Sequence, residues 1–244
     1  MKKNTLLREK NMDVVVDLNV LRGDKFKGDN YIIPLLLIIE LLDSDSINYD
    51  RKMKLLEKIK NREYEIDKRH PRTFFCEAIG EKNRDQDVYD IFIENLLNSS
   101  FTNIVGFKEL IEYNKLTAIK FDNSFVQHDF SKLINKDLYR GKIKENPEIE
   151  TKLKLAVIKR IKKLLVENFK SSNQIESFLM TDSLDVYFSI MAYYQFSAAI
   201  NGHPKKNDFT DINYMLYLTS GRKFYTLDNK INIALRIMRP DLIA

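Results

Sequence analysis

The stretch at residues 13–17, DVVVD, places three consecutive β-branched valines between two acids. A short, valine-rich apolar run of this kind predicts a β-strand that is buried on both faces. Asp17 ends the run. In a parallel sheet, the residue that follows a strand lies at the carboxyl edge, where α/β folds bind their ligands. We therefore expect Asp17 to line the ligand-binding crevice of an α/β fold.

A second strand pattern near the C-terminus ends in the same way, because Asp228 directly follows residues 223–227. Other segments at the two ends alternate between strand and helix patterns. In chain order, we expect a strand at 31–33, helices at 35–42 and 50–62, a helix at 208–218, a helix at 231–238 and a short strand at 241–244. This alternation predicts one parallel sheet assembled from distant parts of the chain.

The middle of the chain has the pattern of helices. Apolar stripes at helical spacing occur at residues 85–97, 107–116 and 146–169, and a long apolar helical region covers 175–200, with a break expected near 181–183. A Gly and a Pro between residues 201 and 204 then interrupt regular structure. We therefore expect an α/β core made of residues 12–60 and 203–244, and a large, mainly helical insertion or subdomain made of residues 61–202.

The composition is that of a soluble globular protein: of 244 residues, 44% are hydrophobic and 31% are charged. The formal net charge of +5 suits a polyanionic partner. Cys76 is the only cysteine, which excludes an internal disulfide and a thiolate zinc site. The longest apolar run, residues 31–42, is too short to span a bilayer. These features predict a cytoplasmic protein without a membrane partner.

Several acids lie in or beside apolar segments. Glu40 is inside the run 31–42, and Asp208 and Asp211 precede an apolar stretch. A buried carboxylate is costly unless it is paired, protonated or bound to a metal, and converging carboxylates need a cation between them. Carboxylate oxygens are the ligands that Mg²⁺ and Mn²⁺ prefer. The candidate catalytic residues are therefore Asp17, Glu40, Asp208, Asp211 and Asp228.

Acids at these places also have a simpler interpretation. Asp and Asn often cap helices and form turns, so Asp208 or Asp211 alone is explained equally well as a cap. Asp228, followed by Asn229, is by itself more typical of a turn. Glu40 is harder to explain in this way, because its neighbours on both sides are apolar. The set as a whole favours a metal site.

Four segments in this order resemble a PIN-domain nuclease: residues 14–21, residues 32–34 with Glu40, residues 207–211, and residues 225–228. The resemblance covers residues 12–60 and 203–244 and does not cover the middle of the chain. It implies a three-layer α/β/α fold with a central parallel sheet, and a metal-dependent ribonuclease. It also implies that Asp17, Glu40, Asp228 and either Asp208 or Asp211 bind Mg²⁺ or Mn²⁺, with Asn19 and Thr226 in supporting positions. We favour Asp208 as the fourth ligand.

Four lysines are candidates for contacts with a nucleic acid. Lys205 and Lys206 precede Asp208 in the same loop, whereas Lys159 and Lys163 lie on the polar side of the helix expected at 146–169. A solvated helix face is the simpler reading of the second pair.

Other functions and partners remain open from the sequence. A structure-specific DNA nuclease would use the same acids, and a protein with a degenerate site would only bind nucleic acid or a partner. Besides RNA or DNA, the expected partners are an inhibitor protein, as in a toxin–antitoxin pair, and a second copy of the chain in a homodimer.

Overall fold

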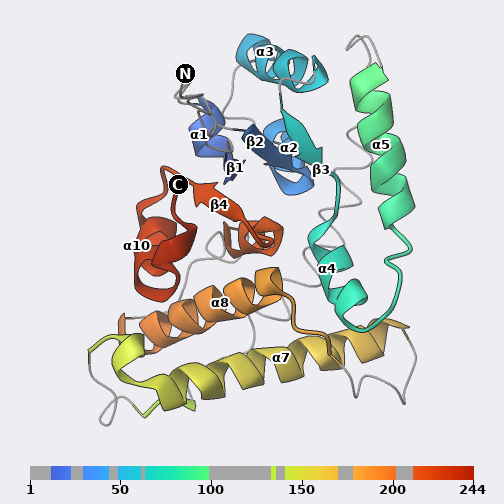
Figure 1. Cartoon of the computed structure of the whole chain (residues 1–244). Coiled ribbons are helices and arrows are strands. Elements are labelled where there is room, and N and C mark those ends of the chain that lie inside the picture. The colour runs from blue at the N-terminus through green and yellow to red at the C-terminus, as the bar shows by residue number, and fades with distance from the viewer. Residues whose placement is uncertain are drawn as a thin grey trace, which may run out of the picture.

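The computed structural model of the chain describes residues 12–22, 30–43, 49–61, 64–98, 133–135, 141–169, 178–201 and 211–244. In this part of the chain, four strands form one sheet in the order β3-β2-β1-β4 (Figure 1). The strands are β1 (Asp13–Val16), β2 (Asn30–Pro34), β3 (Glu65–Asp67) and β4 (Arg222–Tyr225). All neighbouring strands pair in parallel, which confirms the predicted α/β class with a central parallel sheet.

The strand β1 is central because it pairs with β2 on one side and β4 on the other. Its three valines are at most 1% exposed, as expected for a strand covered on both faces. The register pairs Val15 with Ile32 in β2 and Val16 with Tyr225 in β4. Segments from the two ends of the sequence thus lie side by side in the middle of the sheet.

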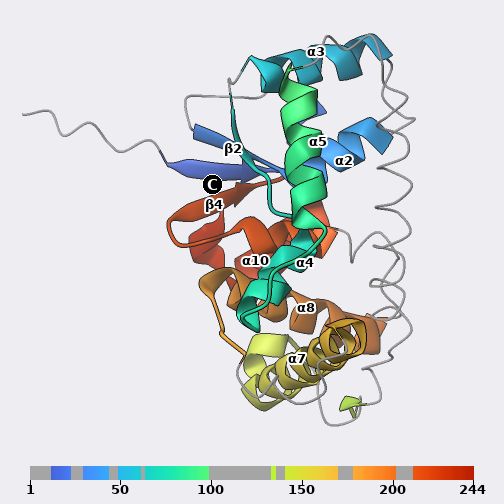
Figure 2. The same cartoon turned by 90° about the vertical axis from the view of Figure 1, so that its right-hand side faces the viewer.

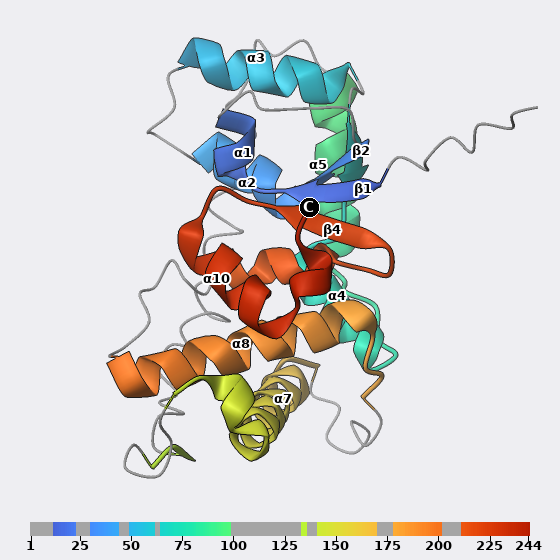
Figure 3. The same cartoon turned by 60° about the vertical axis from the view of Figure 1, so that its left-hand side comes forward.

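Helices cover both faces of the sheet, and Figures 2 and 3 show the layers edge-on. On one face lie α1 (Leu18–Arg22), α2 (Leu35–Asp43) and α3 (Tyr49–Lys60). On the other face lie α10 (Asn229–Met238) and α8 (Asp182–Asn201), and α7 (Pro147–Phe169) packs on the far side of α8. This arrangement is a three-layer α/β/α architecture with one further helix outside it.

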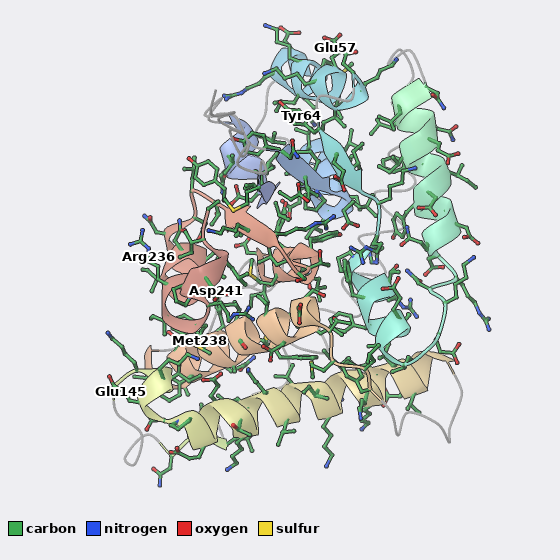
Figure 4. The ribbon with its side chains drawn as sticks, viewed as in Figure 1. Glu57, Tyr64, Glu145, Arg236, Met238 and Asp241 are labelled. Carbon is green, nitrogen blue, oxygen red and sulfur yellow. The ribbon has the colours of Figure 1, made fainter. Side chains whose placement is uncertain are left out.

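The remaining elements are short helices and one peripheral helix. They are α4 (Pro71–Ala78), α5 (Gln86–Asn98), and the 3-10 helices η2 (Ile143–Glu145), η3 (Asn213–Tyr217) and η4 (Pro240–Leu242). The helix α5 packs against α3, and η3 packs against α8. Met238, at the end of α10, is buried where α10 meets α8 (Figure 4).

The described part of the middle segment shares its core with the sheet. Buried residues of the strands, η3, α7 and α8 form one contiguous hydrophobic cluster. Most side chains of α8 are buried, as expected for a helix enclosed between two layers. The predicted apolar stripe of α7 is buried as well, with Leu153, Val157 and Ile161 at most 1% exposed. No described helix has the length and apolar character needed to cross a membrane.

Three details differ from the sequence expectations. Residues 65–67 form β3 at the edge of the sheet, although the sequence places them in the helical insertion. Instead of a final strand at 241–244, η4 forms and only Ile243 makes an isolated bridge to Phe224, because Pro240 suits the first position of a helical turn. From Asp211 onward, the expected helix 208–218 is mostly the 3-10 helix η3. The helix expected at 107–116 lies outside the described residues.

Candidate active site at the carboxyl edge of β1 and β4

The candidate site lies where the strand order reverses. From β1 the chain proceeds to β2 and then β3 on one side, whereas β4 lies on the other side of β1. Ligands of open α/β sheets bind at such a reversal, outside the carboxyl ends of the strands. Because Val16 pairs with Tyr225, the next residues in the two strands, Asp17 and Thr226, lie opposite each other at this edge.

Asp17 is buried and held by hydrogen bonds from two elements. The residue is only 7% exposed to solvent. Oδ1 accepts a hydrogen bond from the backbone N–H of Val20 at 3.0 Å, which satisfies a donor in the first turn of α1. Oδ2 accepts from the hydroxyl of Thr226, and the same Thr226 Oγ1 accepts from the N–H of Asp228 at 2.9 Å. Thr226 therefore links the acid that follows β1 to the acid that follows β4.

The electrostatic setting of Asp17 disfavours its charged form. Burial raises the pKa of Asp17, and the nearby Asp228 carboxylate raises it further. The hydrogen bonds from Thr226 and from the backbone of Val20 and Asn19 act in the opposite direction without cancelling the rise. A cation placed beside this carboxylate would offset the cost of ionising it.

Asp228 is half-buried and caps α10. Its Oδ1 accepts hydrogen bonds from the N–H groups of Lys230 at 2.7 Å and Ile231 at 3.0 Å. The side chain of Asn232 also donates to the carbonyl of Thr226 at 2.9 Å. The sequence offered a turn as the simpler interpretation of Asp228, whereas the structure gives this residue the role of a helix cap. This role coexists with a position beside Asp17, and it fixes the direction in which the Asp228 carboxylate points.

Glu40 joins this region through a tyrosine that the sequence did not single out. The phenol of Tyr214, in η3, donates to Glu40 Oε2 at 2.7 Å. The pKa of Tyr214 is raised by burial, by Glu40, and also by Asp17 and Asp211. Three of the candidate acids thus interact electrostatically with one buried hydroxyl. Tyr214 follows Asp211 by three residues, but this spacing alone does not indicate a contact with Glu40, so the sequence carried no usable signal for the role of Tyr214.

The other predicted residues have different placements. Asp208, Lys205 and Lys206 lie outside the described residues. The side chain of Asn19 is exposed on α1. Lys159 and Lys163 are exposed on α7, and α8 lies between that helix and the sheet (Figure 3). The structure therefore brings Asp17, Asp228 and Thr226 together directly. Glu40 accepts a hydrogen bond from Tyr214, and Asp211 contributes to the electrostatic environment of the same tyrosine. The α7 lysines do not lie at this edge of the sheet.

The described acids share neighbours without forming a compact ligand cluster. Among the residues that the structure describes, no three His, Cys, Asp or Glu side chains are grouped closely enough to hold a metal ion. The donors that face this region are carboxylate oxygens, which match the hard-oxygen preference of Mg²⁺ and Mn²⁺. The chemistry of the donor set therefore fits such an ion.

A second buried carboxylate, Asp67 at the end of β3, is compensated by arginines. It accepts from Arg69 Nε at 2.9 Å and Arg69 Nη2 at 2.7 Å, and from Arg222 Nη1 at 2.7 Å. Burial acts to raise the pKa of Asp67, but the hydrogen bonds from the two arginines outweigh it and the pKa is lowered. Arg222 begins β4, so this network ties the two outer strands of the sheet together. Asp67 and Asp17 are thus equally buried, but the pKa of Asp67 is lowered whereas the pKa of Asp17 is raised.

Comparison with known proteins returns no relative: no protein-family model, no curated protein and no solved structure matches this chain at a significant level.

Proposed function

We propose that this protein is a divalent-metal-dependent nuclease that hydrolyses phosphodiester bonds at the carboxyl edge of β1 and β4, with RNA as its substrate. The observation that carries the proposal is the buried Asp17, whose pKa is raised and which is linked through Thr226 to Asp228 at the point where the strand order reverses. The choice of RNA follows from the resemblance of the sequence segments to PIN-domain nucleases.

Asp17, Glu40, Asp228 and one of Asp208 or Asp211 would hold Mg²⁺ or Mn²⁺. When bound, such an ion supplies charge stabilisation for the phosphodiester oxygens and a more acidic water. The chain itself orients the ligands: Thr226 and the first turn of α1 fix Asp17, and the N-terminus of α10 fixes Asp228. The net charge of +5 favours the approach of a polyanion to this acidic region.

The first prediction concerns metal dependence. Labelled RNA and DNA panels, incubated with Mg²⁺ or Mn²⁺ and with excess EDTA, should show RNA cleavage that EDTA abolishes. Cleavage confined to DNA would replace the RNA assignment by that of a DNA nuclease. Binding without cleavage would favour a degenerate nucleic-acid-binding protein. Cleavage of equal rate in EDTA would refute the metal site.

The same ion should stabilise the folded protein, because a ligand that binds only the native state raises the free energy of unfolding. The expected gain is about 2.7 kcal/mol when the free Mn²⁺ concentration is about 100 times the Kd. A thermal melt with Mn²⁺ is compared with a melt in K⁺ at equal ionic strength. A higher melting temperature in Mn²⁺ indicates a site that binds the metal, and equal temperatures indicate a site that does not.

A third prediction concerns Asp208 and Asp211, of which we expect only one to be indispensable. A site that already contains Asp17, Glu40 and Asp228 needs one further direct ligand. We favour Asp208, because it follows Lys205 and Lys206 and precedes the helical turn that Asp211 begins. Asp208→Asn should reduce cleavage by at least about 100-fold, the equivalent of roughly 3 kcal/mol of transition-state stabilisation, whereas Asp211→Asn should retain measurable turnover. Equal and complete loss in both variants would contradict this division.

A further inference from the structure

Two tyrosines of η3 make matched hydrogen bonds to very different partners. Tyr217 is fully buried and its phenol donates to the backbone carbonyl of Arg69 at 2.7 Å. Tyr214 is 2% exposed and its phenol donates at the same distance to a carboxylate oxygen of Glu40. A buried tyrosine hydroxyl needs a hydrogen-bond partner, and a neutral carbonyl suffices. Burial alone therefore does not explain why the partner of the Tyr214 hydroxyl is a carboxylate.

The ring of Tyr214 is itself held by the strand that carries the other site residues. Its centroid lies 6.0 Å from that of Phe224 in β4, two residues before Thr226. Tyr214 thus packs on β4 at one end and contacts α2 at the other. This one side chain therefore connects Glu40 in α2 with β4, although the two elements are far apart in the sequence.

The hydrogen bond also restricts a long and adaptable side chain. Glutamate has several rotatable bonds, and fixing it in one rotamer costs entropy that a binding event would otherwise have to supply. With Oε2 anchored by the phenol, the Glu40 carboxylate is limited to a narrow range of orientations. Partners that orient a metal ligand in this way are worth a large share of the affinity of the site.

We propose that Tyr214 is a positioning residue of the metal site: its buried hydroxyl orients Glu40 relative to the acids that follow β1 and β4. This inference rests on the proposed metal-dependent function. Tyr214 acts through Glu40 and needs no contact with substrate or metal. The role adds Tyr214 of η3 to a proposed site made of Asp17, Glu40, Asp228 and one of Asp208 or Asp211.

The test compares Mn²⁺ affinity, measured by isothermal titration calorimetry on the full chain, for the wild type, Tyr214→Phe and Tyr217→Phe. Both substitutions remove one buried hydroxyl from the same 3-10 helix and keep the ring. Loss of an orienting partner typically weakens metal binding by about 10- to 100-fold, which is the expected effect of Tyr214→Phe. Tyr217→Phe should keep the wild-type affinity. Melting curves of both variants establish that they fold.

A double-mutant cycle with Glu40→Gln adds a readout that general loosening of η3 would not reproduce. Because Tyr214 acts only through Glu40, adding Tyr214→Phe to Glu40→Gln should weaken Mn²⁺ binding no further. If Tyr214→Phe does not fold, Phe224→Leu, which removes the support of the ring and keeps the hydroxyl, should weaken Mn²⁺ binding in its place.

Three results would overturn the inference, and they are distinguishable. If the wild type and Tyr214→Phe bind Mn²⁺ equally well, Tyr214 has no positioning role and the metal site stands. If Tyr214→Phe and Tyr217→Phe weaken binding equally, the effect belongs to the packing of η3. If the wild type binds no Mn²⁺, the proposed function fails and the inference fails with it.

Discussion

Replacing Asp17 with asparagine is expected to abolish cleavage while the fold survives. Asparagine has nearly the same shape and caps a helix N-terminus as well as aspartate, so α1 keeps its cap. With Asp17 as a ligand of the proposed metal site, the substitution removes one negative charge and with it roughly 3 kcal/mol of transition-state stabilisation, which corresponds to a loss of about 100-fold in turnover. Asp228→Asn should behave in the same way, because asparagine also retains the cap of α10. Unchanged turnover in either variant would remove the nuclease assignment from this edge of the sheet.

The stability of Asp17→Asn provides an independent readout. The folded-state pKa of Asp17 is raised above its unfolded value, so the native state binds the proton more tightly than the unfolded chain does. The contribution of Asp17 to stability therefore decreases as the pH rises from about 4 through the folded-state pKa, and an ionised Asp17 is a net cost at neutral pH. In metal-free buffer at pH 7, the variant should melt at or above the wild-type temperature. A clearly lower melting temperature would show that the charge of Asp17 stabilises the fold.

The second large effect is expected on stability, from Asp67→Asn. Removing one member of a buried ion pair leaves its partners without compensation and typically costs about 3–5 kcal/mol. Here the side chains of Arg69 and Arg222, 33% and 15% exposed, would lose the carboxylate that accepts from both. Arg222 would keep its contacts with Glu65 at 3.4 Å and with the Tyr217 carbonyl at 3.3 Å, so we expect a loss at the lower end of this range. Urea unfolding, with the free energy of unfolding extrapolated to water, measures the loss.

A matched control exists for this substitution. Arg239 makes the same two-pronged contact to Asp241, from Nε at 3.1 Å and Nη2 at 3.0 Å, but that aspartate side chain is 59% exposed beside α10 (Figure 4). A solvent-exposed pair is worth about 0–1 kcal/mol, so Asp241→Asn should change stability little. Equal effects of the two substitutions would mean that burial does not determine the strength of the Asp67 network.

The pH dependence of Asp67 should have the opposite sign to that of Asp17. Its folded-state pKa is lowered, so its stabilising contribution is complete above the unfolded value near 4 and is lost as the pH falls through the folded-state pKa. Wild-type stability below about pH 4 should therefore decrease more steeply than that of Asp67→Asn.

The parts of the fold that were predictable are those whose residues carry a strong local pattern. The valines of β1, the apolar stripe of α7 and the strand before Asp228 all form the expected elements close to the expected bounds. The strand β3 was missed because it has only three residues, Glu65 to Asp67, and the polar–apolar–polar alternation of so short a segment is too brief to indicate a strand. It is a strand only because β2 offers a free edge beside it, and this is a tertiary cause.

The candidate site divides in the same way. Asp17 and Asp228 could be placed from the sequence, because a residue that directly follows a parallel strand lies at the carboxyl edge of the sheet. Tyr214 could not, since its partner Glu40 is 174 residues away and its apolar neighbours make it look like an ordinary core residue. The exposed side of α7 was predictable from its pattern. Its position beyond α8 was not, because no local pattern specifies which layers lie between two helices.

The pairing of β1 with β4 has a consequence for synthesis on the ribosome. Asp17 leaves the exit tunnel early, whereas Thr226 and Asp228 follow some two hundred residues later. Contacts between such distant segments form only after the whole intervening chain is available. A nascent or prematurely terminated polypeptide therefore lacks half of the acidic edge. If the proposed nuclease activity resides at this edge, it would arise only after β4 has been synthesised, and incomplete products would be inactive.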